Sequence, residues 1–405
     1  MSPRSNYQTT ERERVAHERQ YRRSAAEIDL KRIEFNFKAF KNLAPVGTFI
    51  CPMVKANGYG HGDVEVARAL RNAGSGFVGV ALIEEGERLR RSGDRDPILV
   101  FGPCDPSSAE AMLRENLTPV ASGWDQLSAL ESAHSVLGLG RVGIHLEFNT
   151  GMNRLGFDPD DVARLNEWLS DQKDFRIEGI CTHLFSGNDA GEAAGESNGQ
   201  LEKLSVIADG FSAWPDLIVH ALNSSASLNV WSRLQEKKEV PASARKTLGL
   251  RPGIGIYGPN PHNNEHAQME LKPAMTLRTH IASIHWVAKG ESVSYGPIWR
   301  AERESIIATV PFGYADGYRR GLSNKASVLI RGQRVPQVGT VCMDYFMIDV
   351  TDVVGADVKI GEDVVLLGEQ GSEKITADEL ADLCGTISYE IFTAISDRVA
   401  RTYLR

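Results

Sequence analysis

The sequence predicts a (β/α)8 barrel of the TIM type followed by a mostly β C-terminal domain. From residue 47 onward, apolar runs rich in Val, Ile and Leu alternate with segments that have the apolar spacing of helices. Eight such runs precede residue 257, and eight parallel strands covered by helices close a barrel. Beyond residue 272 the apolar pattern alternates, as in antiparallel strands. An open doubly wound sheet is the alternative, but its edge strands should be more polar than these runs.

Length and composition indicate an ordinary two-domain protein. A chain of 405 residues is too long for one small core. Hydrophobic residues make up 42% and charged residues 24%, and the net charge of −8 provides no basic surface for nucleic acid. No apolar run is long enough to span a membrane. We therefore expect small molecules or other protein chains as partners.

The cysteines and the N-terminal residues indicate the cellular compartment of the protein. The five cysteines are scattered and have no paired Cys-x-x-Cys spacing, which argues against a disulfide framework or a zinc site and predicts a cytoplasmic protein. Residues 1–23 carry six arginines, three glutamates and almost nothing apolar, so they predict a disordered arginine-rich extension. An organelle transit peptide is the alternative, which the three glutamates disfavour.

The predicted domains after this extension are a barrel over residues 24–260 and a β-rich domain over residues 261–405. The expected barrel strands are residues 49–55, 77–82, 97–102, 117–122, 142–148, 177–184, 217–223 and 248–256. Helical patterns between them cover residues 84–91, 107–115, 124–132, 158–171 and 200–211. Residues 191–199 predict a mobile loop and residues 258–272 a linker. The β-rich domain has expected strands at 276–287, 305–311, 326–331, 338–350 and 363–367, and a capped helix at 376–383.

The glycine-rich turn at residues 54–62 places Lys55 at the carboxyl end of the first expected strand. A lysine amine that is desolvated, or set beside another cation, becomes a nucleophile toward carbonyls and forms Schiff bases. A solvated loop lysine is equally consistent with this stretch taken alone, because three glycines also suit an ordinary tight turn.

Polar and cationic residues follow several expected strands at the same end of the barrel. They are Lys55, residues 149–154, Thr182 and His183, residues 223–225, and residues 251–255. Barrel enzymes build their sites from these loops, and the loops after strands 7 and 8 commonly hold a phosphate, which suits Ser224 and the backbone near Gly253. Taken singly, His183 is equally a core histidine, Arg154 a helix cap and Gly253 a plain turn. Chance, however, should scatter such residues over both ends.

Eight motifs in this order resemble those of the alanine racemases, among the fold type III pyridoxal phosphate enzymes. They are AEIDL at residues 26–30, VKANGYGHG at 54–62, TGMNRLG at 150–156, NS at 223–224, RPGI at 251–254, SYG at 294–296, GYADG at 313–317 and CMD at 342–344. The resemblance covers nearly all of residues 24–405. It is specific because the motifs recur together over this length, whereas SYG, GYADG and CMD taken singly are ordinary turn and sheet chemistry.

The resemblance implies roles for individual residues. Lys55 would hold pyridoxal 5'-phosphate covalently, and the groups around its phosphate would be Tyr59, Asn223, Ser224, Gly253, Ile254 and Tyr389. Arg251 would face the pyridine nitrogen, Arg154 the phenolic oxygen, and His183 would lie near both the ring and Arg251. Tyr295 and Met343 would enter the same site from the partner subunit, and the substrate would meet Arg154, Met343, Tyr314 and Asp344.

The resemblance also implies an assembly and a reaction. Residues 24–31 would join the β domain, and two chains would form a homodimer with shared sites. The expected reaction interconverts L-alanine and D-alanine and supplies D-alanine for cell-wall peptidoglycan. Racemisation removes the α-proton on one face and returns one on the other, so two groups of moderate pKa are needed, which Lys55 and Tyr295 would provide. Arg251, whose guanidinium group does not give up its proton, would leave the ring nitrogen unprotonated.

The chain departs from the family pattern at Glu147, where many members carry a carbamylated lysine. A glutamate side chain is shorter than a carbamylated lysine by roughly 3 to 4 Å, so we expect no direct contact between Glu147 and Arg154. We also expect no carbamate at this position. Asn149 and Ala400 stand where aspartate and proline are usual. A serine or broader racemase and a pyridoxal phosphate carrier remain alternatives. This sequence lacks the motifs of the decarboxylases and of the metal-assisted lyases of the same fold type. We expect no metal site.

Overall fold

The computed structural model describes residues 22–185, 192–235, 248–259, 269–353 and 357–405. The chain forms two compact units: Leu30–Ala274, and the residues up to Asp29 together with Met275–Arg405. The predicted fold class, a barrel followed by a mostly β domain, is confirmed. Apart from Arg22 and Arg23, the predicted N-terminal extension lies outside the described residues. No helix in the described ranges is both long and apolar enough to cross a membrane.

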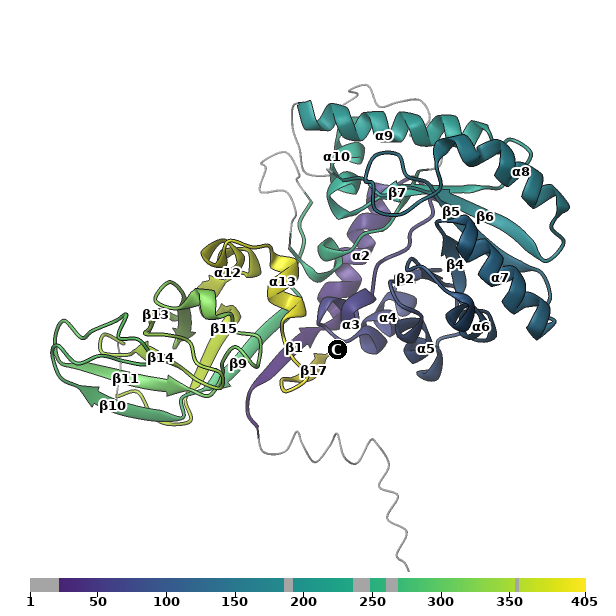
Figure 1. The fold of residues 1–405 in the computed structure, drawn as a ribbon. Coiled ribbons are helices and arrows are strands. Elements are labelled where there is room, and N and C mark those ends of the chain that lie inside the picture. The colour runs from purple at the N-terminus through teal and green to yellow at the C-terminus, as the bar shows by residue number, and fades with distance from the viewer. Residues whose placement is uncertain (1–21, 186–191, 236–247, 260–268, 354–356) are drawn as a thin grey trace, which may run out of the picture. The chain divides into compact units, whose positions relative to one another are not determined.

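The barrel unit is built on seven parallel strands that follow one another in chain order (Figure 1). They are β2 (Val78–Val80), β3 (Ile98–Val100), β4 (Thr118–Ala121), β5 (Val142–Glu147), β6 (Phe175–Cys181), β7 (Ile218–Leu222) and β8 (Leu248–Leu250). Parallel pairing joins each strand to the next. Their apolar side chains are largely buried, as expected for strands covered by helices.

The first expected strand, residues 49–55, forms two isolated bridges rather than a regular strand. Ile50 bridges Leu250 of β8, and Met53 bridges Gly79 of β2, both in parallel. This extended segment therefore hydrogen-bonds to the first and last strands of the sheet and closes it. Pro52, which has no N–H to donate, interrupts the ladder and accounts for the missing strand.

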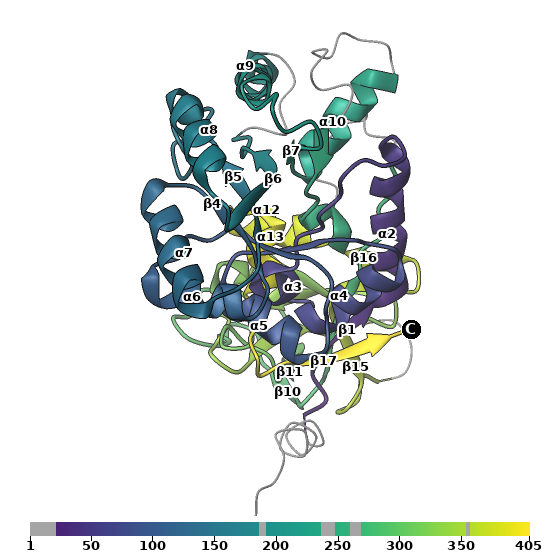
Figure 2. The same ribbon diagram turned by 90° about the vertical axis from the view of Figure 1, so that its right-hand side faces the viewer.

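Helices surround the barrel sheet. They are α2 (Leu30–Leu43), α3 (Lys55–Tyr59), α4 (Asp63–Asn72), α5 (Ile83–Arg91), α6 (Pro106–Arg114), α7 (Trp124–Leu137), α8 (Val162–Asp171), α9 (Glu192–Asp209) and α10 (Ser224–Gln235). Figure 2 shows α6, α7 and α8 in succession along one side of the sheet. The predicted mobile loop at residues 191–199 is wrong from Glu192 onward, because its Ala and Glu residues are good helix formers and begin α9.

In its described residues the second unit is a ten-stranded sheet with two α-helices. Its elements are β1 (Ala25–Asp29), β9 (Met275–His280), β10 (Ser283–Val287), β11 (Ser305–Val310), β12 (Ser327–Ile330), β13 (Gln333–Val338), β14 (Phe346–Asp349), β15 (Asp363–Gln370), β16 (Glu373–Ile375), β17 (Ala400–Leu404), α12 (Ala377–Cys384) and α13 (Ser388–Thr393). β1 pairs with β9 in antiparallel and with β17 in parallel, although 245 residues separate β1 from β9.

Several expected elements of the chain have different bounds in the structure, and the strand expected at residues 276–287 is divided into β9 and β10. The strand expected at residues 338–350 is broken, because β13 ends at Val338 and Gly339 takes a left-handed φ of 76°. The strand expected at 248–256 ends at Leu250, and the residues after Pro252 form the 3-10 helix η2 (Ile254–Tyr257). The division between the two compact units falls between Ala274 and Met275.

Candidate active site

Lys55 stands at the entry to a left-handed helical turn. Residues 56–58 have φ between 52° and 60°, and the N–H of Gly58 donates to the carbonyl of Val54 at 2.8 Å. A left-handed helix costs L-residues roughly 1–2 kcal/mol each, so surrounding contacts must hold this turn. The backbone at Lys55 is therefore fixed by tertiary structure rather than by local preference.

Glu85 supplies contacts that hold the turn. Its Oε1 accepts from the N–H of Ala56 at 2.6 Å, and its Oε2 accepts from the N–H groups of Ala81 at 2.8 Å and Leu82 at 3.1 Å. The side chain is buried, and three backbone donors compensate for the removal of the carboxylate from water. Glu85 thus ties the turn after Lys55 to the end of β2.

The loops after β7 and β8 meet at Ser224, the first residue of α10. Its Oγ accepts from the N–H groups of Gly253 at 2.8 Å and Gly255 at 3.1 Å. The phenol of Tyr59 lies against Gly253, where an added Cβ would come within 2.4 Å of the phenolic oxygen. Backbone N–H groups, two hydroxyls and a helix N-terminus converge here, and such a set fits a phosphate group. We refer to these residues as the phosphate cradle.

Two predicted phosphate neighbours flank the cradle. Asn223 caps α10, because its Oδ1 accepts from the N–H of Ala226 at 2.9 Å. Ile254 opens η2 and is 1% exposed, so its side chain packs in the core while its backbone borders the cradle. Both residues therefore also shape the local fold.

Arg251 is buried among neutral acceptors. Its Nη1 donates to His220 Nδ1 at 3.0 Å, and its Nη2 donates to the carbonyl of Thr182 at 2.8 Å and to His183 Nδ1 at 3.4 Å. Because arginine only donates, both imidazoles accept at Nδ1 and carry their proton on Nε2. Burial and the charge of Arg251 lower the pKa of His183 to about 3. The guanidinium thus keeps its full positive charge.

A second histidine extends this chain into the barrel interior. His220 Nε2 donates to His145 Nδ1 at 2.9 Å, and both rings are fully buried. Burial, then the charge of Arg251, lowers the pKa of His145 to about 3 and the pKa of His220 well below its usual value. His145 Nε2 has no hydrogen-bond partner within the described part of the chain. The hydrogen bonds from Arg251 to His220 and from His220 to His145 therefore fix the position of the guanidinium group.

Electrostatics favour an unprotonated amine at Lys55. Burial lowers the pKa of Lys55, and the positive charge of Arg154 lowers it further; Glu85 opposes these effects and Arg251 adds to them. A lysine amine acts as nucleophile or base only when unprotonated. The arrangement is therefore suited to covalent or proton-transfer chemistry at Nζ.

Glu147 and Arg154 are held apart. Glu147 ends β5 and is 6% exposed, whereas Arg154 is exposed in the loop that follows, and they form no ion pair among the described residues. The loop folds back on β5, since Asn149 N–H donates to Phe157 O at 3.0 Å. Burial raises the pKa of Glu147, and the charges of Arg251 and Arg154 oppose that rise. Glu147 is thus a buried carboxyl near two cations that it does not contact.

Tyr295 belongs to the β unit, where its phenol is 74% exposed on a well-fixed backbone. Its carbonyl accepts from Thr340 Oγ1 at 2.7 Å, and Ser294 Oγ donates to the Thr340 carbonyl at 2.6 Å. Ser294 has a left-handed φ of 70°. The loop therefore presents an aromatic side chain to solvent at a defined position.

The other predicted residues of the β unit lie in neighbouring loops or in α13. Met343 and Tyr314 are 53% and 43% exposed, on two loops joined by a hydrogen bond from Ala315 N–H to Met343 O at 3.0 Å. Asp344 Oδ1 accepts from Arg398 Nη2 at 2.7 Å. Tyr389 lies in α13, where burial raises its pKa to about 12.

Sequence reasoning missed Glu85, His145 and His220. Each carried a signal, because a histidine within an apolar strand, or a glutamate three residues after a strand end, needs a partner once buried. The partners themselves are 29 to 75 residues distant along the chain, so the sequence pattern does not reveal them. No cluster of three or more metal-ligating side chains is present in the described residues.

Comparison with known proteins identifies the family. The family model for the alanine racemase N-terminal domain matches residues 28–261, and the model for the C-terminal domain matches residues 274–403. The alanine racemase of Symbiobacterium thermophilum is 40% identical over 380 residues, which cover 93% of this chain and 96% of that protein. The chain belongs to the alanine racemase family.

Solved structures of the family share the fold. Alanine racemase from Bacillus anthracis with bound L-Ala-P gives a TM-score of 0.82 at 32% identity, covering 95% of this chain and 96% of that one. Alanine racemase from Bartonella henselae with covalently bound pyridoxal phosphate gives 0.81 at 26% identity, covering 94% and 99%. The resemblance predicted from the motifs is thereby confirmed. Both units of this alanine racemase family member are spanned by the matches.

Proposed function

We propose that this protein is a pyridoxal phosphate-dependent racemase that interconverts L-alanine and D-alanine. The observation that carries this proposal is the meeting, at one end of one barrel, of Lys55 with its lowered pKa, the phosphate cradle at Ser224, and Arg251 held by neutral histidines. Membership of the alanine racemase family and the cofactor in the Bartonella henselae relative support the same cofactor here. D-Alanine for cell-wall peptidoglycan is the proposed use of the product.

The residues fit the cofactor's chemical groups. Pyridoxal phosphate, when bound, supplies the electron sink that makes the α-proton of an amino acid acidic. Lys55 would hold it and would then exchange a proton with the α-carbon through Nζ, which the lowered pKa favours. The hydroxyl of Ser224, which the N–H groups of Gly253 and Gly255 hold in place, the phenol of Tyr59 and the N-terminus of α10 would hold the phosphate. Arg251 would donate a hydrogen bond to the pyridine nitrogen without releasing its proton.

Tyr295 of a second subunit is our candidate for the base on the opposite face of the substrate. A single base tends to return its proton to the face from which it came, so inversion needs a second group. The exposed phenol on a fixed loop suits a residue that acts on another chain. In this proposal the enzyme is a homodimer with shared sites, and Met343, Tyr314, Asp344 and Arg154 line the substrate side.

Proton exchange in D2O tests the reaction. The cofactor-loaded protein is incubated with L-alanine, and in parallel with L-serine, while α-deuterium and the D-enantiomer are measured together. We expect α-deuterium and D-alanine to form at similar rates, with serine slower. Exchange with full retention, or none at all, would contradict a two-base racemase. Faster turnover of serine would change the proposed substrate but not the reaction.

Mixing two inactive variants tests the shared site. Lys55→Ala and Tyr295→Phe each remove one base, and a mixed dimer would contain one intact site. Random re-association makes about half of the dimers mixed, and each mixed dimer has one intact site of two. About a quarter of all sites, and so about a quarter of the wild-type activity, should therefore be restored. Tyr345→Phe, which changes another half-exposed tyrosine of the β unit, is the matched control. If mixing restores nothing although native mass spectrometry shows mixed dimers, both bases come from one chain.

A further inference from the structure

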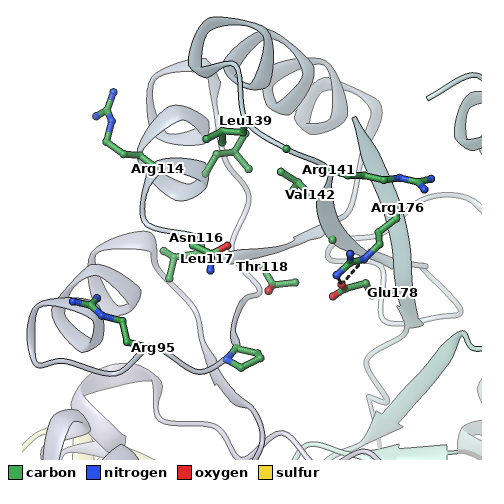
Figure 3. Close-up of a pocket in the computed structure, with 14 residues that line it drawn as sticks. Arg95, Arg114, Asn116, Leu117, Thr118, Leu139, Arg141, Val142, Arg176 and Glu178 are labelled. Atoms are coloured by element: carbon green, nitrogen blue, oxygen red, sulfur yellow. Dashed lines mark hydrogen bonds and ion pairs between the residues drawn. The ribbon is translucent and has the colours of Figure 1, made fainter. Parts of the chain in front are cut away.

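The barrel has a second concave site at the opposite ends of its strands. The amino ends of β3 to β6 line a pocket of about 450 Å³ (Figure 3). Pro97 precedes β3, whereas Thr118 and Val142 are the first residues of β4 and β5. The residues of the candidate active site follow the carboxyl ends of the strands, so the two sites share no lining residue. We call this feature the amino-end pocket.

The lining of the amino-end pocket is strongly basic. It contains four arginines, Arg95, Arg114, Arg141 and Arg176, and one carboxylate, Glu178. The chain as a whole carries a net charge of −8, so this concentration of positive charge departs from the average surface. A concave site with one sign of charge attracts ions of the opposite sign.

Two of the arginines lack a carboxylate partner among the described residues. Arg95 Nη1 donates to the carbonyl of Arg90 at 3.3 Å, and Arg141 Nε donates to the carbonyl of Phe175 at 3.0 Å. In Figure 3 the guanidinium groups of Arg95, Arg114 and Arg141 lie at separate places around the pocket. Their donors are available to an incoming ligand.

The other two arginines have weak partners. Arg114 pairs with Glu110, and Arg176 pairs with Glu178; both arginine side chains are more than half exposed, at 59% and 56%. Exposed ion pairs contribute only about 0–1 kcal/mol. A doubly charged ligand therefore exchanges these contacts at little cost.

Three leucines form an apolar part of the wall, beside the polar side chains of Asn116 and Thr118. Leu113 and Leu117 are buried, and Leu139 is 37% exposed at the edge of the pocket. Gly143 lets the Glu178 carboxyl group lie against the backbone of β5, because a Cβ at this position would come within 2.2 Å of the carboxyl carbon. A cationic rim beside a wall of leucines fits a ligand that has both an anionic and an organic part.

We propose that the amino-end pocket binds a small organic phosphate with two or more negative charges. The planar guanidinium group donates two parallel hydrogen bonds to phosphate oxygens, and several such groups match several charges. The leucine wall holds the organic part. This inference concerns the barrel alone and does not depend on the proposed racemase activity.

Calorimetric titration of the cofactor-loaded enzyme tests the pocket with two probes, inorganic diphosphate and adenosine diphosphate. We expect both to bind, with affinities that fall as salt is added. The double variant Arg95→Gln/Arg141→Gln should bind diphosphate about ten-fold or more weakly. Arg303→Gln, which removes an exposed ion-paired arginine of the β unit, should bind as the wild type does. Tighter binding of the nucleotide supports an organic ligand, and equal binding of the two probes would contradict it.

A second pair of variants keeps every arginine. Leu139→Glu adds a negative charge to the wall and should weaken binding of both probes several-fold, whereas Leu139→Gln should change the affinity for diphosphate little. The proposal is wrong if neither probe binds, if all variants bind alike, or if binding releases the cofactor, which its absorbance reports. In the last case the phosphate cradle, not the amino-end pocket, is the site.

Discussion

The carboxyl and amino ends of the barrel strands both gather positive charge, but they hold it differently. At the carboxyl ends Arg251 is buried, and its hydrogen bonds end on neutral imidazoles and a carbonyl. At the amino ends the four arginines of the amino-end pocket are exposed, and they bind carbonyls or surface carboxylates. Buried partners fix the position of a charge, whereas exposed ones leave it free to move.

This difference separates two uses of a cation. A reaction needs groups held within a fraction of an ångström, so desolvation and fixed partners are worth their cost at the carboxyl ends. Binding of a soluble anion needs charge and access, which exposed arginines provide. Substitutions at the carboxyl ends should therefore change activity more than substitutions at the amino ends do.

Removal of the Lys55 amine should have the largest effect. Lys55→Ala removes both the proposed attachment point of the cofactor and a base, so turnover of L-alanine should fall by more than about 10²–10⁴-fold. Lys38→Ala, on the exposed face of α2, is the control and should retain full turnover. Substantial activity in Lys55→Ala would place the chemistry elsewhere.

Filling the space at Gly253 should weaken cofactor binding. The added Cβ of Gly253→Ala would lie 2.4 Å from the Tyr59 hydroxyl, so the phenol must move. Overpacking of this kind costs about 1–3 kcal/mol, or roughly 5–150-fold in the dissociation constant of pyridoxal phosphate, measured by fluorescence. Gly76→Ala meets no atom within 4 Å and should bind normally. Equal affinities would show that the cradle does not hold the phosphate.

Changing Glu85 tests what holds the left-handed turn. Glu85→Gln keeps one acceptor oxygen for three backbone donors, so the free energy of unfolding should fall by about 1–3 kcal/mol. The exposed neighbour Glu84→Gln should change it by less than about 0.5 kcal/mol. Urea unfolding of the two variants measures the difference, and equal stabilities would mean that the turn is held by other contacts.

The buried histidines predict a pH dependence of stability. His145 has a pKa of about 3 in the folded protein, against 6.5 ordinarily, so below pH 6.5 the unfolded chain binds a proton that the native one does not. The stability contributed by neutral His145 is complete above pH 6.5 and declines as the pH falls toward 3.

Glutamine at position 145 does not titrate, so His145→Gln should lose less stability between about pH 7.5 and 5 than the wild type does. Urea unfolding at several pH values measures this slope. His285→Gln, at an exposed histidine of β10, should keep the wild-type slope. Equal slopes for wild type and His145→Gln would contradict the neutral, buried state of His145.

Bicarbonate should have no effect on activity. Position 147 carries a carboxyl rather than an amine, so it forms no carbamate with carbon dioxide. Turnover measured in carbon dioxide-free buffer should equal turnover with added bicarbonate. A clear stimulation would show that another amine near Arg154 takes that role.

Some elements and site positions were predicted correctly from the sequence and others were not. The eight apolar runs predicted the barrel, and Lys55, Ser224 and Arg251 were placed at one end because parallel strands share the direction of their carboxyl ends. The strand expected at residues 49–55 became two bridges, since Pro52 lacks a donor. The strand expected at 338–350 became a loop after Gly339. The pattern of apolar residues alone did not predict the breaks at Pro52 and Gly339.

The order of strands and helices, the family, and the position of Lys55 after the first barrel segment were determined by the sequence itself, because periodicity and short motifs are local properties of the chain. Tertiary structure alone decided that residues 56–58 wind left-handed, that Arg251 meets two imidazoles, and that four arginines share one pocket. Glu85 reaches Ala56 from 29 residues away, and His220 reaches His145 across 75. Such contacts depend on strand register, including the shift in β5 between Ile144 and His145, and only the closed barrel fixes that register.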